Sequence, residues 1–169
     1  MNNELIALIA NLALTLSFII ALIFGIVQVK TTNRDRRERL TLETLRSFET
    51  REFAELLHHI TIGNLPSTYE EWLAYPAGDR IRFIQFGQQM ESLGLLLAEH
   101  LINIDLVDKT LGSFVVAAWN KYKNLFLDMR QKQSDPFLGE YFQWMAEQID
   151  SRMKENARKP FFETHVIAN

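Results

Sequence analysis

The sequence predicts an all-α protein in which an N-terminal transmembrane helix continues into a stalk helix and an antiparallel helical bundle. Three observations indicate this fold class. The first thirty positions are almost purely apolar, and the later apolar residues recur mostly at helical steps of three and four. No run alternates between apolar and polar residues as a half-buried strand does. With 4 Pro and 7 Gly in 169 residues, little of the chain remains for long loops.

The first element is the apolar run from Leu5 to Val29, which contains no charged residue. At about 1.5 Å per residue it forms a helix of roughly 37 Å, longer than a hydrocarbon core of about 30 Å. A cleaved signal peptide is the rival interpretation. It is disfavoured because no basic residue precedes the run, the run is too long, and no small-residue cleavage motif follows it. Residues 1–29 are therefore predicted to be a transmembrane anchor.

A basic cluster follows the anchor and consists of Lys30, Arg34, Arg36, Arg37 and Arg39. Only Glu4 and the amino terminus carry charge before the anchor. The positive-inside rule therefore predicts a single-pass protein of the cell membrane, with its N-terminus outside and its C-terminal domain in the cytoplasm. In a bacterium this would be the inner membrane. The basic cluster is expected to contact membrane lipid at the headgroups.

The remainder of the chain is acidic. The totals of 21 acidic and 18 basic residues include three acids and five bases before Leu40, so 18 acids and 13 bases follow, a net charge of -5. Such a domain repels phosphate backbones, and no nucleic-acid partner is expected. The absence of cysteine excludes disulfides, thiol catalysis and thiolate metal sites.

Small residues recur within the anchor at steps of four, namely Ala13, Ser17, Ala21 and Gly25. One stripe of small residues lets two helices approach closely, and the amide of Asn11 lies near this face. The stripe predicts a homo-oligomer that packs through the anchors. The alternative is that the spacing arises by chance, since Ala and Gly are common in membrane helices.

The elements after the anchor follow from apolar spacing and capping residues. A basic juxtamembrane segment and stalk helix are expected over 30–62, because no Gly or Pro interrupts them before Gly63. A helical cytoplasmic domain is expected over 63–157, followed by a tail over 158–169.

Four helices are predicted within this cytoplasmic domain. A capping box at 67–70 opens a short helix, and Asp79 caps a helix over 80–102. A further helix covers 106–132, and Asp135 with Pro136 opens the last one. Gly87 and Gly94 lie inside one of these helices, where each costs about 1 kcal/mol, so a compensating feature such as close packing is expected.

A set of residues is distributed between Phe86 and Arg130: Phe86, Met90-Glu91, Gly94, Ile104-Asp105, Leu106-Val107, Gly112, Trp119 and Arg130. This set resembles the bacterial and phage family catalogued as domain of unknown function 4760. The resemblance implies a short protein with an N-terminal membrane helix and a helical cytoplasmic part. It implies no activity, substrate or catalytic residue. A setting in phage or mobile-element biology follows from the resemblance alone.

The adjacent His58 and His59 are the first place to look for a metal site. Neighbouring helical residues point about 100° apart and do not readily hold one ion, although Glu55 and His59 share a face. A polar helix end is the preferred interpretation, and no metal or cofactor is expected.

A possible interface or pocket group consists of Trp72, Glu91, Trp119, Tyr122 and Arg130. Trp72 and Trp119, together with Trp144, are interpreted first as core or interface residues and only second as ligand platforms. Glu91 and Arg130 are interpreted as separate charges, with a buried pair as the alternative.

No Gly-rich phosphate loop or nucleophile elbow occurs, so a catalytic role is not expected. The leading hypothesis is a membrane-anchored, self-associating interaction module for an unknown protein partner. One alternative is a membrane-perturbing effector or pore, with Asn11, Thr15 and Ser17 lining a polar path. The other is an enzyme with an unrecognised site.

Overall fold

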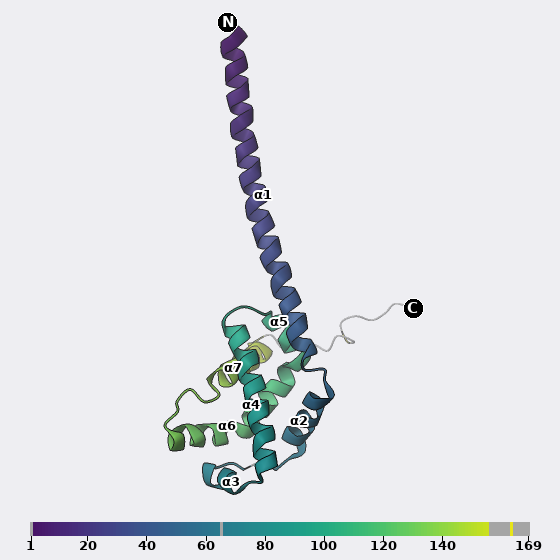
Figure 1. Cartoon of the computed structure of the whole chain (residues 1–169), viewed down its shortest axis with the longest axis vertical. Coiled ribbons are helices and arrows are strands. Elements are labelled where there is room, and N and C mark those ends of the chain that lie inside the picture. The colour runs from purple at the N-terminus through teal and green to yellow at the C-terminus, as the bar shows by residue number, and fades with distance from the viewer. Residues whose placement is uncertain (1, 65, 156–162, 164–169) are drawn as a thin grey trace, which may run out of the picture. The chain divides into compact units, whose positions relative to one another are not determined.

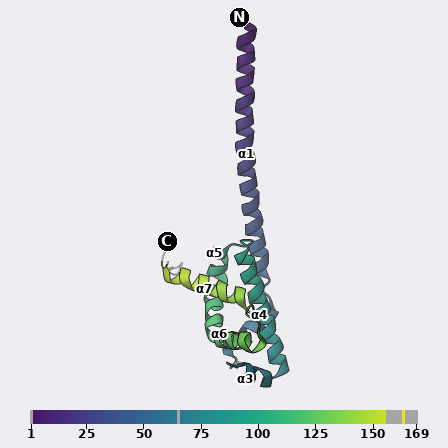
Figure 2. The same ribbon diagram turned by 90° about the vertical axis from the view of Figure 1, so that its left-hand side faces the viewer.

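The computed structural model describes residues 2–64, 66–155 and 163. The chain divides into two units, Met1–Arg39 and Leu40–Asn169. Within the described residues every regular element is a helix, which confirms the all-α prediction (Figure 1 and Figure 2). The predicted tail over 158–169 lies outside the described residues except for Glu163.

Helix α1 (Asn2–Arg46) carries the apolar run and continues through the basic cluster without a break. Its apolar side chains between Leu5 and Val29 are exposed. Among the described helices it alone is long and apolar enough to cross a membrane. The hydroxyl of Thr15 donates to the carbonyl of Asn11 at 2.8 Å, so this polar group is satisfied within the helix, as a hydrocarbon environment requires.

The predicted stalk helix does not run through to Ile62, and a turn at residues 47–50 interrupts it. Helix α1 ends before this turn and α2 (Arg51–Ile62) begins after it. Thr50 Oγ1 caps α2 by accepting a hydrogen bond from Phe53 N at 3.2 Å. The rings of Phe48 and Phe53 meet edge to face across the turn, with centroids 4.9 Å apart. The Thr50 cap and the contact between Phe48 and Phe53 thus stabilise a break between α1 and α2, although no Gly or Pro lies at this position.

The second unit continues with α3 (Tyr69–Ala74), α4 (Ala77–Ala98), α5 (Ile104–Val107), the π-helical turn η1 (Asp108–Gly112), α6 (Ser113–Gln133) and α7 (Glu140–Glu155). The helix predicted over 106–132 therefore divides into α5, η1 and α6. The last helix starts four residues later than expected at Pro136. Asp135 accepts a hydrogen bond from Phe137 N at 3.1 Å, and Gly139 has a φ of 72°, so this segment forms turns instead of the first helical turn.

Two other predicted helix starts also shift. The capping box before α3 lies one residue later than predicted, because Thr68 accepts from Glu71 N at 3.3 Å while the Glu71 carboxylate accepts from Ser67 N at 2.9 Å. Helix α4 begins before Asp79, which lies in its first turn and pairs with a side chain instead of capping the helix.

The core of the second unit is rich in aromatic side chains. Helix α7 packs against α4 and α6 (Figure 2). Phe142 of α7 lies edge to face with Phe86 and with Trp119, at centroid distances of 5.7 and 5.3 Å. Such edge-to-face pairs contribute about 0.5–1.5 kcal/mol beyond the area they bury. This continuous cluster holds the bundle together.

The two helical glycines of α4 differ in their surroundings. A Cβ atom on Gly94 would lie 2.3 Å from the carbonyl oxygen of Tyr141, so this glycine lets α7 approach α4 closely. A Cβ atom on Gly87 would meet only Phe126 Cζ at 3.8 Å, an ordinary contact. Close packing therefore explains Gly94 and leaves Gly87 unexplained.

The last turns of α1 belong to the second unit, and Thr41 is fully buried there. Its Oγ1 accepts a hydrogen bond from Asn103 N at 2.8 Å. We expect Thr41→Val to keep the side-chain shape, leave this N–H unpaired and lower the free energy of unfolding by about 1–3 kcal/mol. Urea titration of the full chain in detergent, followed by tryptophan fluorescence, measures the free energy of unfolding. Exposed Thr61→Val is the control, and an equal loss there would contradict the prediction.

Candidate functional site

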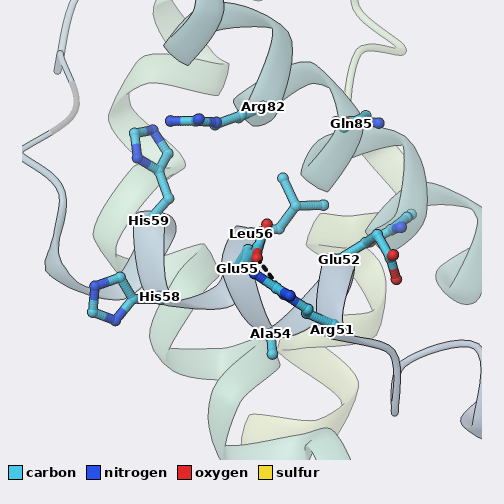
Figure 3. A pocket seen from close by; sticks show the side chains of 10 residues that line it. Arg51, Glu52, Ala54, Glu55, Leu56, His58, His59, Arg82 and Gln85 are labelled. Carbon is cyan, nitrogen blue, oxygen red and sulfur yellow. Dashed lines mark hydrogen bonds and ion pairs between the residues drawn. The ribbon is translucent and has the colours of Figure 1, made fainter.

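A polar hollow of about 690 Å³ lies between α2 and α4 (Figure 3). Three of its four Arg and Glu side chains, those of Arg51, Glu55 and Arg82, are paired within the chain, the last with Asp79 beside the hollow. Arg51 Nε donates to Glu55 Oε1 at 2.8 Å. Asp79 Oδ1 accepts from Arg82 Nη1 at 3.2 Å and lies 3.6 Å from His59 Nε2. Because both signs of charge alternate and pair here, the hollow presents no concentrated field for one anion or cation.

The two neighbouring histidines do not converge on one point. His59 lies beside Arg82, whereas His58 is directed away from it (Figure 3). Over residues 2–64, 66–155 and 163, no group of three His, Cys, Asp or Glu side chains is placed to hold a metal ion. A structural zinc site uses four ligands and a catalytic one three, so this part of the chain offers no such set.

A smaller, apolar hollow of about 220 Å³ lies between α4, α6 and the segment that joins α6 to α7. Its lining residues are Phe83, Ile84, Gly87, Gln88, Glu91, Phe126, Met129, Leu138 and Gly139. The missing side chain of Gly87 leaves part of this space open. The volume is below the range of about 300–1,000 Å³ that is usual for small-molecule sites.

Glu91 of α4 caps the start of α7. Its two carboxylate oxygens accept hydrogen bonds from Tyr141 N at 3.2 Å and Phe142 N at 2.9 Å. These amides belong to the first turn of α7, where N–H groups have no partner within the helix. A carboxylate also interacts favourably with the positive end of the helix dipole. Glu91 therefore fixes α7 against α4.

Arg130 of α6 holds the same region from another side. Its Nε donates to the carbonyl of Leu138 at 2.8 Å, and its Nη1 donates to Gln143 Oε1 at 2.7 Å. In the described structure Glu91 and Arg130 thus bind the joining segment and the first turns of α7, and they do not form the buried pair weighed as an alternative. They act as two positioning groups for one helix.

The aromatic members of the predicted interface or pocket group lie in the core. Trp72 packs edge to face on Phe83 at a centroid distance of 5.1 Å, and Trp119 packs on Phe142. Trp119 also borders a third hollow, between α6 and α7. The hydroxyl of Tyr122 donates to the carbonyl of Ile60. Burial raises the pKa of Tyr122 to about 12, so the phenol remains a proton donor at neutral pH.

Lys121 caps the C-terminal end of α2, a role that was not predicted from the sequence. Its Nζ donates to the carbonyl oxygens of Ile60, Thr61 and Gly63 at 3.0, 2.8 and 2.9 Å. These carbonyls lie at the end of α2, where helical C=O groups lack partners. Because about sixty residues separate donor and acceptors, no local sequence signal points to this contact.

The first unit displays the two predicted features of the anchor on α1. The stripe residues Ala13, Ser17, Ala21 and Gly25 are exposed, as is Asn11. A Cβ atom on Gly25 would meet nothing within 4 Å. The basic cluster lies on the same helix and is also exposed, with Arg34 Nε donating to Glu38 Oε1 at 2.8 Å.

Comparison with known proteins identifies a family. A family model described as Domain of unknown function (DUF4760) matches residues 15–149. No curated protein and no solved structure matches the chain. The matched range includes most of the apolar run and the described second unit up to Ile149, the last buried core residue of α7.

Proposed function

The chain belongs to the DUF4760 family of domains of unknown function, and on that premise we propose that it is a membrane-anchored interaction module without catalytic activity. In this proposal α1 crosses the cell membrane once, and the second unit lies in the cytoplasm. Copies self-associate through their anchors and present the second unit to a protein partner. A phage or mobile-element setting is part of the proposal and rests on the family alone.

The observation that carries the proposal is the exposed apolar length of α1. The large apolar side chains of α1 from Leu5 to Val29 remain about half exposed or more. Water disfavours so large an apolar surface, whereas a bilayer accepts it. The basic cluster that follows supports a cytoplasmic second unit.

Self-association is supported by Gly25 of the stripe, because no contact within the single chain requires a glycine at this position. Gly25 lies in open space in the single chain, although glycine weakens a helix by about 1 kcal/mol. A second helix packed along the stripe would supply such a contact, because small residues let backbones approach closely. The same open space means that a larger side chain at Gly25 does not disturb the single chain.

The second unit supports a binding role through an exposed apolar side chain at its small hollow. Ile84 is 50% exposed and lines the apolar hollow. Exposed apolar surface of this kind is typical of protein contact sites and ligand grooves.

Crosslinking in membranes tests self-association. We expect the parent chain to give crosslinked dimers or larger species, and the double variant Ala21→Ile with Gly25→Ile to lose most of them. The control places bulk on the opposite face of α1, with Ile19→Phe and Ile26→Phe, and should retain crosslinking. A parent chain that stays monomeric, or equal losses in both variants, would overturn the claim.

No observation favours a pore over this role. The Thr15 hydroxyl, predicted to line a polar path, donates to its own helix at Asn11 O. Dye leakage from vesicles that contain the full chain would support the pore and contradict the proposal of an interaction module.

A further inference from the structure

We propose that Lys30, Arg34 and Arg37 form a binding face for anionic phospholipid headgroups. The inference rests on the proposed function, because it requires α1 to cross a membrane. It adds a ligand class and a specific face of the helix to that function.

The three residues share one side of α1. Successive residues of a helix turn by about 100°, so positions 30, 34 and 37 fall within an arc of about 60°. With the same turn of about 100° per residue, Arg36 and Arg39 lie roughly on the other side of the helix. Helix α1 is continuous from Asn2 to Arg46, so it displays these side chains at fixed positions.

The rise of the helix places this face at headgroup depth. Lys30, Arg34 and Arg37 follow Val29 by about 1.5, 7.5 and 12 Å along the axis. The headgroup layer of one leaflet extends about 5–7 Å beyond the hydrocarbon. Lys30 lies inside this layer, Arg34 lies at its edge, and the long side chain of Arg37 reaches back toward it. Arg36 and Arg39 follow at about 10.5 and 15 Å, so the side of the helix, and not the depth, separates Arg36 from this face.

The chemistry of these residues suits phosphate with a net negative charge. A guanidinium binds phosphate oxygens with two parallel N–H donors, and an ammonium binds them as a point charge. Five bases and the two acids Asp35 and Glu38 give residues 30–39 a net charge of +3. A zwitterionic headgroup carries its own cation and so gains less from this field than an anionic one.

The Arg34–Glu38 ion pair does not keep Arg34 from binding a headgroup. Arg34 Nε lies 2.8 Å from Glu38 Oε1, and the two side chains are 79% and 45% exposed. Exposed pairs of this kind stabilise a protein little, so a headgroup phosphate displaces Glu38 at small cost.

Lipid-protein association in reconstituted vesicles tests the proposal. The full chain is placed in phosphatidylcholine vesicles that contain a trace of spin-labelled phosphatidylglycerol or spin-labelled phosphatidylcholine. The fraction of motionally restricted label gives the relative association constant of the two lipids. We expect a preference for the anionic lipid in the parent chain.

Two double variants remove the same charge from different faces. Lys30→Gln with Arg34→Gln should lower the preference by up to about 25-fold, since each of the two bases near the surface contributes about fivefold. Arg36→Gln with Arg39→Gln should change it less than twofold. An equal fall in both variants, or a parent chain without preference, would overturn the proposed face.

Two further measurements distinguish lipid binding from binding of soluble phosphate and from failure of the membrane anchor. A greater fall in preference with inorganic phosphate than with sodium chloride of equal ionic strength would assign the face to a soluble phosphate and overturn the lipid assignment. Flotation with pure phosphatidylcholine vesicles after an alkaline wash reports the anchor itself. Protein that floats but shows no lipid preference refutes only the binding face, whereas protein that does not float refutes the proposed membrane span.

Discussion

Replacing Gly94 by alanine is expected to lower the free energy of unfolding of the second unit by about 2–4 kcal/mol. The new Cβ would lie 2.3 Å from the carbonyl oxygen of Tyr141 and 2.6 Å from its carbonyl carbon. Both atoms belong to the backbone at the start of α7, so relief requires this helix to move away from α4. The higher helix propensity of alanine offsets only about 1 kcal/mol of the loss.

The control for this prediction is the same substitution two turns earlier. Gly87→Ala adds a Cβ whose nearest neighbour is Phe126 Cζ at 3.8 Å, so it should stabilise the unit by up to about 1 kcal/mol. Urea titration of the full chain in detergent measures both effects. Tryptophan fluorescence is specific here because all three Trp residues lie in the second unit. Shifts of the same sign in the two variants would refute the packing argument.

Removing the carboxylate of Glu91 is expected to lower the free energy of unfolding by about 2–4 kcal/mol in Glu91→Ala. The substitution leaves the amides of Tyr141 and Phe142 without their acceptor and removes the charge that faces the start of α7. Glu91→Gln should lose about half as much, since one amide oxygen still accepts a hydrogen bond. The same titration measures each variant.

Glu55→Ala provides the matched control for this second prediction. Glu55 is also a helical glutamate, but its side chain is exposed and pairs with Arg51, four residues earlier. Its loss should change the free energy of unfolding by less than about 0.5 kcal/mol. If Glu91→Ala behaves like Glu55→Ala, the capping role of Glu91 is wrong.

The candidate sites were only partly predictable. Glu91 and Arg130 stand out in the sequence as separate charges or as a possible pair. Their actual partners are the first turns of α7 and the segment before it. Lys121 does not stand out at all, because its partners at the end of α2 lie about sixty residues away. Contacts between residues so far apart in the sequence depend on how the helices pack, and they cannot be predicted from the spacing of residues along the chain.

The sequence by itself determined the helical class, the apolar helix of the first unit and its basic flank. These follow from periodicity and local composition, which act over one or two helical turns. The tertiary structure alone decided the different roles of Gly87 and Gly94 and the partners of Glu91 and Arg130. Each of these depends on a side chain or backbone from another helix, such as the carbonyl of Tyr141 that faces Gly94. Local propensity is weak beside packing, and so packing decided which glycine is needed for the contact between α4 and α7.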